Sequence, residues 1–304
     1  MKQKTAAVLL LMFLILTGCN RSQGGGAGAR AAANPGGTAG SAAVINRIIS
    51  TAPSNTEIII GLGLGNRIIA TDKYSMEISG LPPDIAEIDF FYPDPEAIIG
   101  LAPDIIITSE HNVYGAGDDP FRLLKEMGIA VVYLPTSNSI ADIYRDIENI
   151  AAALGAAEKG NELIRTMREQ IDRIAAPGNS ITEKKSVYFE ISPAPNMVSM
   201  GRETFLGEMI ELIGAQNVFA DKNGWIAPGA EAVLERNPDV ILTNVSFIDD
   251  PVGEIKNRDG FHTIKAVRDN AVYTIDTDSS SRPSQHIILA LRQIAHAVYP
   301  DYYD

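Results

Sequence analysis

The side chains most suited to covalent catalysis occur together once in the sequence, at Ser109, Glu110 and His111. A hydroxyl, a carboxylate and an imidazole are the groups of a hydrolytic triad, but such triads are assembled in space from separate segments. Three consecutive side chains point in different directions, and no nucleophile-elbow pattern is present. We therefore predict that the protein is not an enzyme, although a fold alone does not fix a function.

A metal site would need several imidazole or carboxylate groups that converge on one ion. The chain has four histidines: His111, His262, His286 and His296. His286 and His296 fall on one predicted C-terminal helix, about 15 Å apart along its axis, so they cannot share an ion through that helix alone. His111 follows a predicted strand, where a single loop histidine is more often solvated. We predict no metal site.

Aromatic residues make up only 7% of the chain, so their clusters in predicted loops are informative. Tyr74 follows a predicted strand, and Phe90, Phe91 and Tyr92 precede a predicted short helix. Trp225, the only tryptophan, precedes a matching helix in the second half. We expect these loops to line a cleft. The alternative is that Phe90 or Phe91 fills the core.

Arg282 stands in a predicted polar loop before the last helix. A guanidinium at this place could bind a ligand carboxylate in bidentate fashion. It could equally cap neighbouring carbonyl groups or pair with Asp276 or Asp278, and the residues alone leave these alternatives open.

Gly61, Gly63 and Gly65 invite comparison with a phosphate-binding turn, which must follow a strand and open a helix. Ser54 and Glu57 instead predict a capping box at a helix start. The glycines then come at the end of that helix, where they are expected to terminate it.

The elements that carry these residues are duplicated. Residues 96–108 align with residues 231–243 without a gap, and Glu, Ala, Pro, Asp, Ile and Thr recur at matched positions. Each copy predicts a short helix, a Pro-Asp turn and a buried strand. A weaker echo relates residues 57–66 to residues 208–217. Two α/β lobes therefore follow each other in the chain.

Two helices are predicted between the lobes. Ser139 can cap the first, and Gly155 offers it a left-handed stop. The second, at about residues 156–176, would form a rod of roughly 30 Å. A single rod between two lobes permits little hinge bending.

The N-terminus has the order of an export signal, with Lys2 and Lys4 before an apolar run that is too short to span a bilayer. Cys19, the only cysteine, sits where the lipoprotein pattern places the acylated thiol; the alternative is a stray cysteine beside a cleavable signal. Residues 20–44 are rich in Gly, Ala and Ser and predict a flexible tether. The formal charge of −13 becomes −15 without the two lysines, which disfavours nucleic acid as a partner.

Signal, tether, two α/β lobes and one long connecting helix together resemble the rigid-helix class of ABC-transporter solute-binding proteins. The resemblance covers residues 47–299, and its most specific stretches are residues 50–57, 63–66, 103–106 and 281–284. It implies two α/β lobes with mainly parallel central sheets joined by one long helix, with the ligand cleft between the lobes. The expected organisation is a signal peptide at 1–19, a tether at 20–44, an N-terminal lobe at 45–137, connecting helices at 138–177 and a C-terminal lobe at 178–304.

The class carries cobalamin, ferric siderophores, haem and, in one branch, zinc or manganese. Its cobalamin binders place aromatic side chains at the positions that match Tyr74, Phe91 and Trp225, and we add Tyr92 and Arg282 as candidate contacts. The resemblance thus implies an exported, lipid-anchored monomer without a cofactor. It would capture a corrinoid or a ferric siderophore, with haem or zinc and manganese as alternatives.

The resemblance also implies a docking site for the permease dimer, which works with its ATPase subunits. Glutamates at the positions that match Glu96 and Glu231 form salt bridges with permease arginines in this class. A helix-dipole role for both residues is the alternative. Glu57 and Glu208 form a second, less favoured candidate pair.

Overall fold

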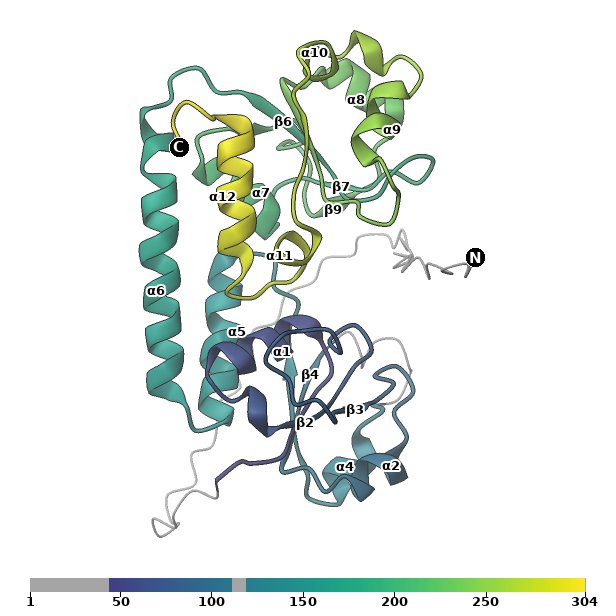
Figure 1. The fold of residues 1–304 in the computed structure, drawn as a ribbon, viewed down its shortest axis with the longest axis vertical. Helices are drawn as coiled ribbons and strands as arrows, with labels where there is room; N and C mark the ends of the chain where they lie inside the picture. The colour runs from purple at the N-terminus through teal and green to yellow at the C-terminus, as the bar shows by residue number, and fades with distance from the viewer. Residues whose placement is uncertain (1–43, 111–118, 304) are drawn as a thin grey trace, which may run out of the picture. The chain divides into compact units, whose positions relative to one another are not determined.

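The computed structural model describes residues 44–110 and 119–303 (Figure 1). Cys19, the signal segment, the tether up to residue 43 and His111 lie outside these residues. In the described part of the chain, no helix is long and apolar enough to cross a membrane.

The first lobe is built on a parallel sheet of five strands in the order β3-β2-β1-β4-β5. Its strands are β1 Ile48–Ser50, β2 Ile68–Thr71, β3 Ala86–Glu87, β4 Ile105–Ser109 and β5 Ala130–Leu134. Its helices are α1 Pro53–Gly61, α2 Pro95–Gly100 and α4 Arg122–Glu126. Ile105 and Ile107 of β4 pack in one core cluster and Ile106 packs in another. Both faces of the sheet are therefore covered, as the apolar repeat predicted.

The second lobe has a parallel sheet in the order β11-β10-β6-β8 and a small antiparallel pair, β7 with β9. Its strands are β6 Ser186–Glu190, β7 Ser199–Met200, β8 Gln216–Asn217, β9 Trp225–Ile226, β10 Val240–Thr243 and β11 Val272–Thr274. Its helices are α7 Phe205–Leu212, α8 Ala230–Arg236, α9 Pro251–Asn257, α10 Lys265–Arg268, α11 Thr277–Ser281 and α12 Ile287–Val298. The predicted fold class of two lobes with parallel sheets is confirmed.

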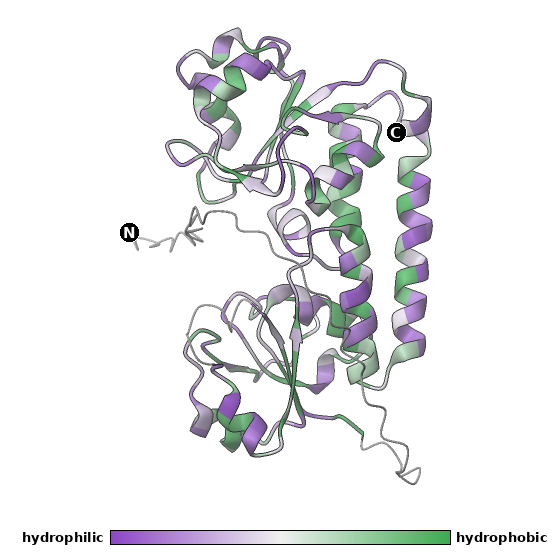
Figure 2. Ribbon diagram, turned by 180° about the vertical axis from the view of Figure 1, so that it is seen from behind, coloured by the Kyte–Doolittle hydropathy of each residue, from purple (hydrophilic) through white to green (hydrophobic). Residues whose placement is uncertain are grey.

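Two helices join the lobes, α5 Ile140–Ala153 and α6 Ala157–Ala175. Ser139 caps α5 in a capping box with Asp142, and Gly155 adopts the left-handed conformation between the two helices, as predicted. Figure 2 shows apolar and polar positions alternating along α6, whose apolar face packs on α5 and α12. One core cluster contains residues of both sheets together with α5, α6 and α12. The lobes therefore share apolar packing along these helices.

Both copies of the sequence repeat form the predicted helix, turn and strand. The first copy is α2 followed by β4, and the second is α8 followed by β10. Gly61 is the last residue of α1, and Gly63, with a φ of 72°, follows the C-cap, so these two glycines lie at the helix end as predicted. The related Gly214 after α7 has a φ of 82°, so the weaker echo also reflects a common structure.

The predicted capping box at Ser54 and Glu57 is wrong. The N-cap of α1 is Ala52, whose side chain makes no capping hydrogen bond, and Pro53 begins the helix. Proline suits this first position because its missing N–H would have no helical partner. Ser54 therefore lies inside the helix, and Glu57 is directed to partners elsewhere in the chain. The predicted polar loop before Arg282 is also wrong in part, since residues 277–281 form the short helix α11.

A buried carboxylic acid in α5 makes the stability of this fold pH-dependent. Burial raises the pKa of Asp146 to about 6, although the Ser137 hydroxyl donates to Asp146 and acts in the opposite direction. The folded chain then holds this proton more tightly than the unfolded chain, whose carboxyl pKa is about 4. The stabilising contribution is full below pH ~4 and is lost as pH rises through about 6.

Replacing Asp146 with Asn should remove this pH dependence. The variant should gain on the wild type by about 2–3 kcal/mol in free energy of unfolding between pH ~4 and pH ~7. Urea unfolding of both proteins at the two pH values measures the gain. A difference between the proteins that stays constant with pH would contradict the assignment.

Candidate functional site

Loops that follow parallel strands emerge at the carboxyl edge of the sheet, where α/β proteins bind ligands. In the first lobe, this edge carries the predicted aromatic residues. The ring of Phe90 lies 6.4 Å from that of Tyr74 in an edge-to-face arrangement and 4.1 Å from that of Phe91. Phe91 is 46% exposed and Tyr92 is 83% exposed, so neither of these two rings fills the core. The structure therefore brings the aromatic residues of the loops after β2 and β3 together.

Two carboxylates fix these two loops, the buried Asp72 and the exposed Asp89. Asp72, at the end of β2, accepts hydrogen bonds from the Tyr74 amide (2.8 Å) and the Ser75 hydroxyl (2.5 Å). Asp89 accepts hydrogen bonds from the amides of Phe91 (2.8 Å) and Tyr92 (3.1 Å). Both carboxylates thus shape the backbone beneath the aromatic rings.

Trp225 lies on a strand rather than in the predicted loop. It stands opposite Met200 in the β7–β9 pair and is 37% exposed. Asn217 is buried behind this pair, and its Nδ2 donates to the Met200 carbonyl at 2.9 Å. In Figure 1, β7 and β9 lie on the side of the second lobe nearer to α11. The tryptophan therefore has a fixed backbone platform.

Phe247 is an exposed aromatic residue that the sequence reasoning missed. It follows β10 and is 48% exposed, beside a hollow of about 390 Å³ to which Val245, Ser246 and Asp276 contribute. The base of its loop is held by the Thr277 hydroxyl, which donates to the Asn244 carbonyl at 2.6 Å. The sequence feature that could have indicated Phe247 is its position just after the second copy of the repeat, since His111 follows the first copy at a similar distance.

Arg282 has two carboxylate partners. Its Nη1 lies 2.9 Å from Glu57 Oε1 and its Nη2 lies 2.8 Å from Asp278 Oδ1. Pairing with Asp278 was one of the predicted alternatives, whereas Asp276 instead caps α11 through the Ser279 amide. Glu208, of the less favoured docking pair, accepts a hydrogen bond from the Ile140 amide at 2.8 Å. Glu57 and Glu208 thus already have partners within the chain.

Glu96 and Glu231 occupy equivalent first-turn positions in α2 and α8. Both are exposed, and neither carboxylate has an ion-pair partner in residues 44–110 and 119–303. In α2, capping is done by Asp94, whose carboxylate accepts from the Glu96 amide at 2.9 Å. The first lobe therefore does not need the Glu96 side chain to cap its helix.

A buried charge network supports the end of the central strand of the second lobe. Arg258 binds both oxygens of Glu190 at 2.8 and 3.0 Å and also pairs with Glu254. Burial acts to lower the pKa of Arg258, but hydrogen bonds to Glu190 and Glu254 outweigh it and raise that pKa. Each of these side chains has its partner within the lobe, so we assign the network a structural role.

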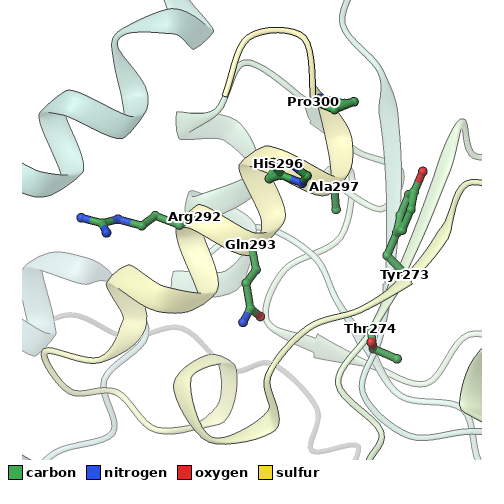
Figure 3. Close-up of a pocket in the computed structure, with 7 residues that line it drawn as sticks. All are labelled: Tyr273, Thr274, Arg292, Gln293, His296, Ala297 and Pro300. Carbon is green, nitrogen blue, oxygen red and sulfur yellow. The ribbon is translucent and has the colours of Figure 1, made fainter. Parts of the chain in front are cut away.

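A second hollow, of about 600 Å³, lies between β11 and α12 (Figure 3). Tyr273, His296 and Arg292 are among the residues that line it, and the guanidinium of Arg292 donates to Gln170 of α6. None of the predicted ligand-binding residues reaches this hollow. In the described ranges, no three His, Cys, Asp or Glu residues are grouped so that they could hold a metal ion.

Comparisons with known proteins agree with this architecture. A family model described as periplasmic binding protein matches residues 48–279. An uncharacterised ABC transporter substrate-binding lipoprotein of Bacillus subtilis is 32% identical over 260 residues, covering 84% of this chain and 80% of the relative. A vitamin B12-binding protein of Vibrio parahaemolyticus is 27% identical, covering 82% and 88%. The crystal structure of a possible iron-binding (periplasmic solute-binding) protein from Staphylococcus epidermidis has a TM-score of 0.76 at 30% identity, covering 84% and 99%.

Proposed function

Because the chain belongs to the periplasmic binding protein family, as a solute-binding protein of an ABC transporter and not an enzyme, we propose that it captures a corrinoid or a ferric siderophore. One observation carries the proposal: both lobes present exposed aromatic rings on fixed backbone, after the parallel strands β3 and β10 and on the antiparallel strand β9. Phe91 and Tyr92 supply them in the first lobe, and Trp225 and Phe247 supply them in the second. The proposed site lies between the lobes at these rings.

Large flat ligands suit such a site. Aromatic rings offer wide apolar contact at a low cost in side-chain entropy, and each stacked ring adds about 0.5–1.5 kcal/mol beyond its buried area. Cobalamin is our first choice, because the aromatic positions match those of the family's cobalamin binders and because a B12-binding protein is among the relatives. A ferric siderophore is the second choice, supported by the similar structure described as possibly iron-binding. Haem is the third.

Arg282 enters this proposal only as a secondary contact. Its guanidinium already binds Glu57 and Asp278, so a ligand carboxylate would have to compete with two others. We therefore propose that the aromatic rings, rather than an arginine, provide most of the affinity.

Titration with cyanocobalamin and with a ferric hydroxamate should change the fluorescence of Trp225, the only tryptophan in the chain. Replacing Phe91 with Ala should weaken binding of the true ligand about tenfold, which corresponds to about 1.4 kcal/mol. Tyr273→Ala is the matched control, since Tyr273 is also an exposed aromatic residue (38%, against 46% for Phe91) but lines the hollow of Figure 3. Calorimetry gives the affinities.

The ligand proposal fails if cobalamin, ferric siderophores and haem all fail to bind while zinc or manganese binds tightly. A loss of binding in the Tyr273 variant but not in the Phe91 variant would move the site to the hollow beside α12.

We further propose that Glu96 and Glu231 dock the protein on its permease. Two exposed carboxylates, one on each lobe at equivalent positions and neither ion-paired with the residues that the structure describes, suit a permease dimer with two equivalent contacts. The alternative is that each side chain only complements the positive end of its helix, which is worth at most about 1 kcal/mol.

Replacing both Glu96 and Glu231 with Gln should reduce uptake sharply and leave ligand affinity within about twofold, because the rim charges contact the permease and not the ligand. Glu126→Gln with Glu235→Gln is the control pair, with one exposed carboxylate on each lobe. Docking of the wild type should weaken as ionic strength rises. Normal transport by the Glu96/Glu231 variant would return both residues to the helix-end role.

We propose that the protein is exported and held at a membrane surface by lipid on Cys19, as the signal pattern and the lipoprotein relative suggest. With Cys19 replaced by Ser, the chain should lose acyl modification and appear in the soluble exported fraction, because no thiol remains to carry lipid. Metabolic labelling with a fatty acid and cell fractionation measure this. Unchanged membrane retention would contradict the anchor.

A further inference from the structure

One residue of the first lobe, Glu57, accepts hydrogen bonds from three residues of the second lobe. Glu57 of α1 accepts hydrogen bonds from Arg282 Nη1 (2.9 Å) and from the Ser284 hydroxyl (2.5 Å), one on each carboxylate oxygen. The Gln285 side chain donates to the main-chain carbonyl of Glu57 at 2.8 Å. These three residues belong to the segment between α11 and α12, which we call the lock segment, residues 282–285.

The contact is buried and closely fitted. Glu57 is 5% exposed, so its charge depends on these partners rather than on water. Along the same helix, a Cβ on Gly61 would come within 3.0 Å of Gln285 Nε2, which shows how closely α1 approaches the lock segment. A buried carboxylate that loses its cation is strongly disfavoured, whereas an exposed pair contributes little. The ion pair of Arg282 with Glu57 therefore contributes more to holding this contact together than its ion pair with Asp278, whose side chain is 61% exposed.

The lock segment joins the lobes at a second place. The helices α5 and α6 form the covalent connection and share apolar packing with both lobes, but small rotations about them would still change the spacing between the lobes. A second attachment through Glu57 opposes that rotation. We propose that Glu57 is a positioning residue that locks the lobes at one spacing, so that the aromatic rings of both stay in register for a ligand. Only this consequence for the ligand rests on the proposed function; the lock itself does not.

Distances between spin labels test the lock directly. The full chain with Cys19→Ser has no other cysteine, so Gly100→Cys in α2 and Glu235→Cys in α8 give one label on each lobe. Gly100 is suitable because a Cβ added there meets no heavy atom of the described residues within 4 Å. Pulsed dipolar spectroscopy should give one narrow distance distribution for this protein. With Glu57→Gln, the width should at least double.

Two further variants separate a lock from a general structural role. Asp278→Asn removes only the exposed ion pair of Arg282 and should leave the distance distribution narrow. Arg282→Lys keeps a cation and should restore part of the order lost in Arg282→Gln. If Glu57→Gln does not fold, Ser284→Ala and Arg282→Gln replace it in the same measurement. Folded variants with a distribution identical to that of the parent protein would overturn the proposal.

The ligand measurement is kept separate. In Glu57→Gln, the affinity for whichever chelate or corrinoid binds the parent protein should fall about tenfold, mainly through faster dissociation. If the distances broaden but no such ligand binds the parent protein, the lock stands and the proposed function fails. If the affinity falls while the distances stay narrow, the lock is wrong and Glu57 acts in another way.

Discussion

The parallel course of the strands in both central sheets is the constraint on which the rest of the structure depends. The inner strands β1, β4, β6 and β10 are covered on two faces, and neighbouring residues of each strand enter different cores, so their side chains are used for packing. The loops after the strands are left to vary, and they all emerge at one edge of each sheet. Aromatic side chains in those loops become exposed together because the backbone beneath them is fixed.

Buried polar groups do this fixing at the strand ends. Asp72 and Asn217 each use their side-chain atoms on main-chain groups of a neighbouring turn or strand, and each is buried. A hydrophobic residue at either place would leave those main-chain groups unpaired. Asp72 and Asn217 thus hold the main chain next to the exposed rings. They explain how Tyr74 and Trp225 can be partly exposed and still ordered.

Patterns that depend on local sequence were predicted well. The repeat gave helix, turn and strand in both lobes, and Ser139 caps α5, because capping and apolar periodicity act within a few residues. Ser54 and Glu57 matched a capping box equally well, but Arg282 lies 225 residues further along and binds Glu57 instead. No local pattern carries that partner. Phe247 was missed because a lone phenylalanine looks the same in a core and on a surface.

The distance in sequence between Glu57 and the lock segment also bears on how the chain folds during synthesis. The first lobe is synthesised well before residues 282–285. Until then, the Glu57 carboxylate stays hydrated and the face of α1 that the lock segment covers stays exposed. Contacts of such long separation form late and slow the final step of folding. Until that step, the chain exposes apolar surface that α12 will later cover, and exposed surface of this kind promotes aggregation. Among the described helices, α12 is therefore the one that closes the molecule.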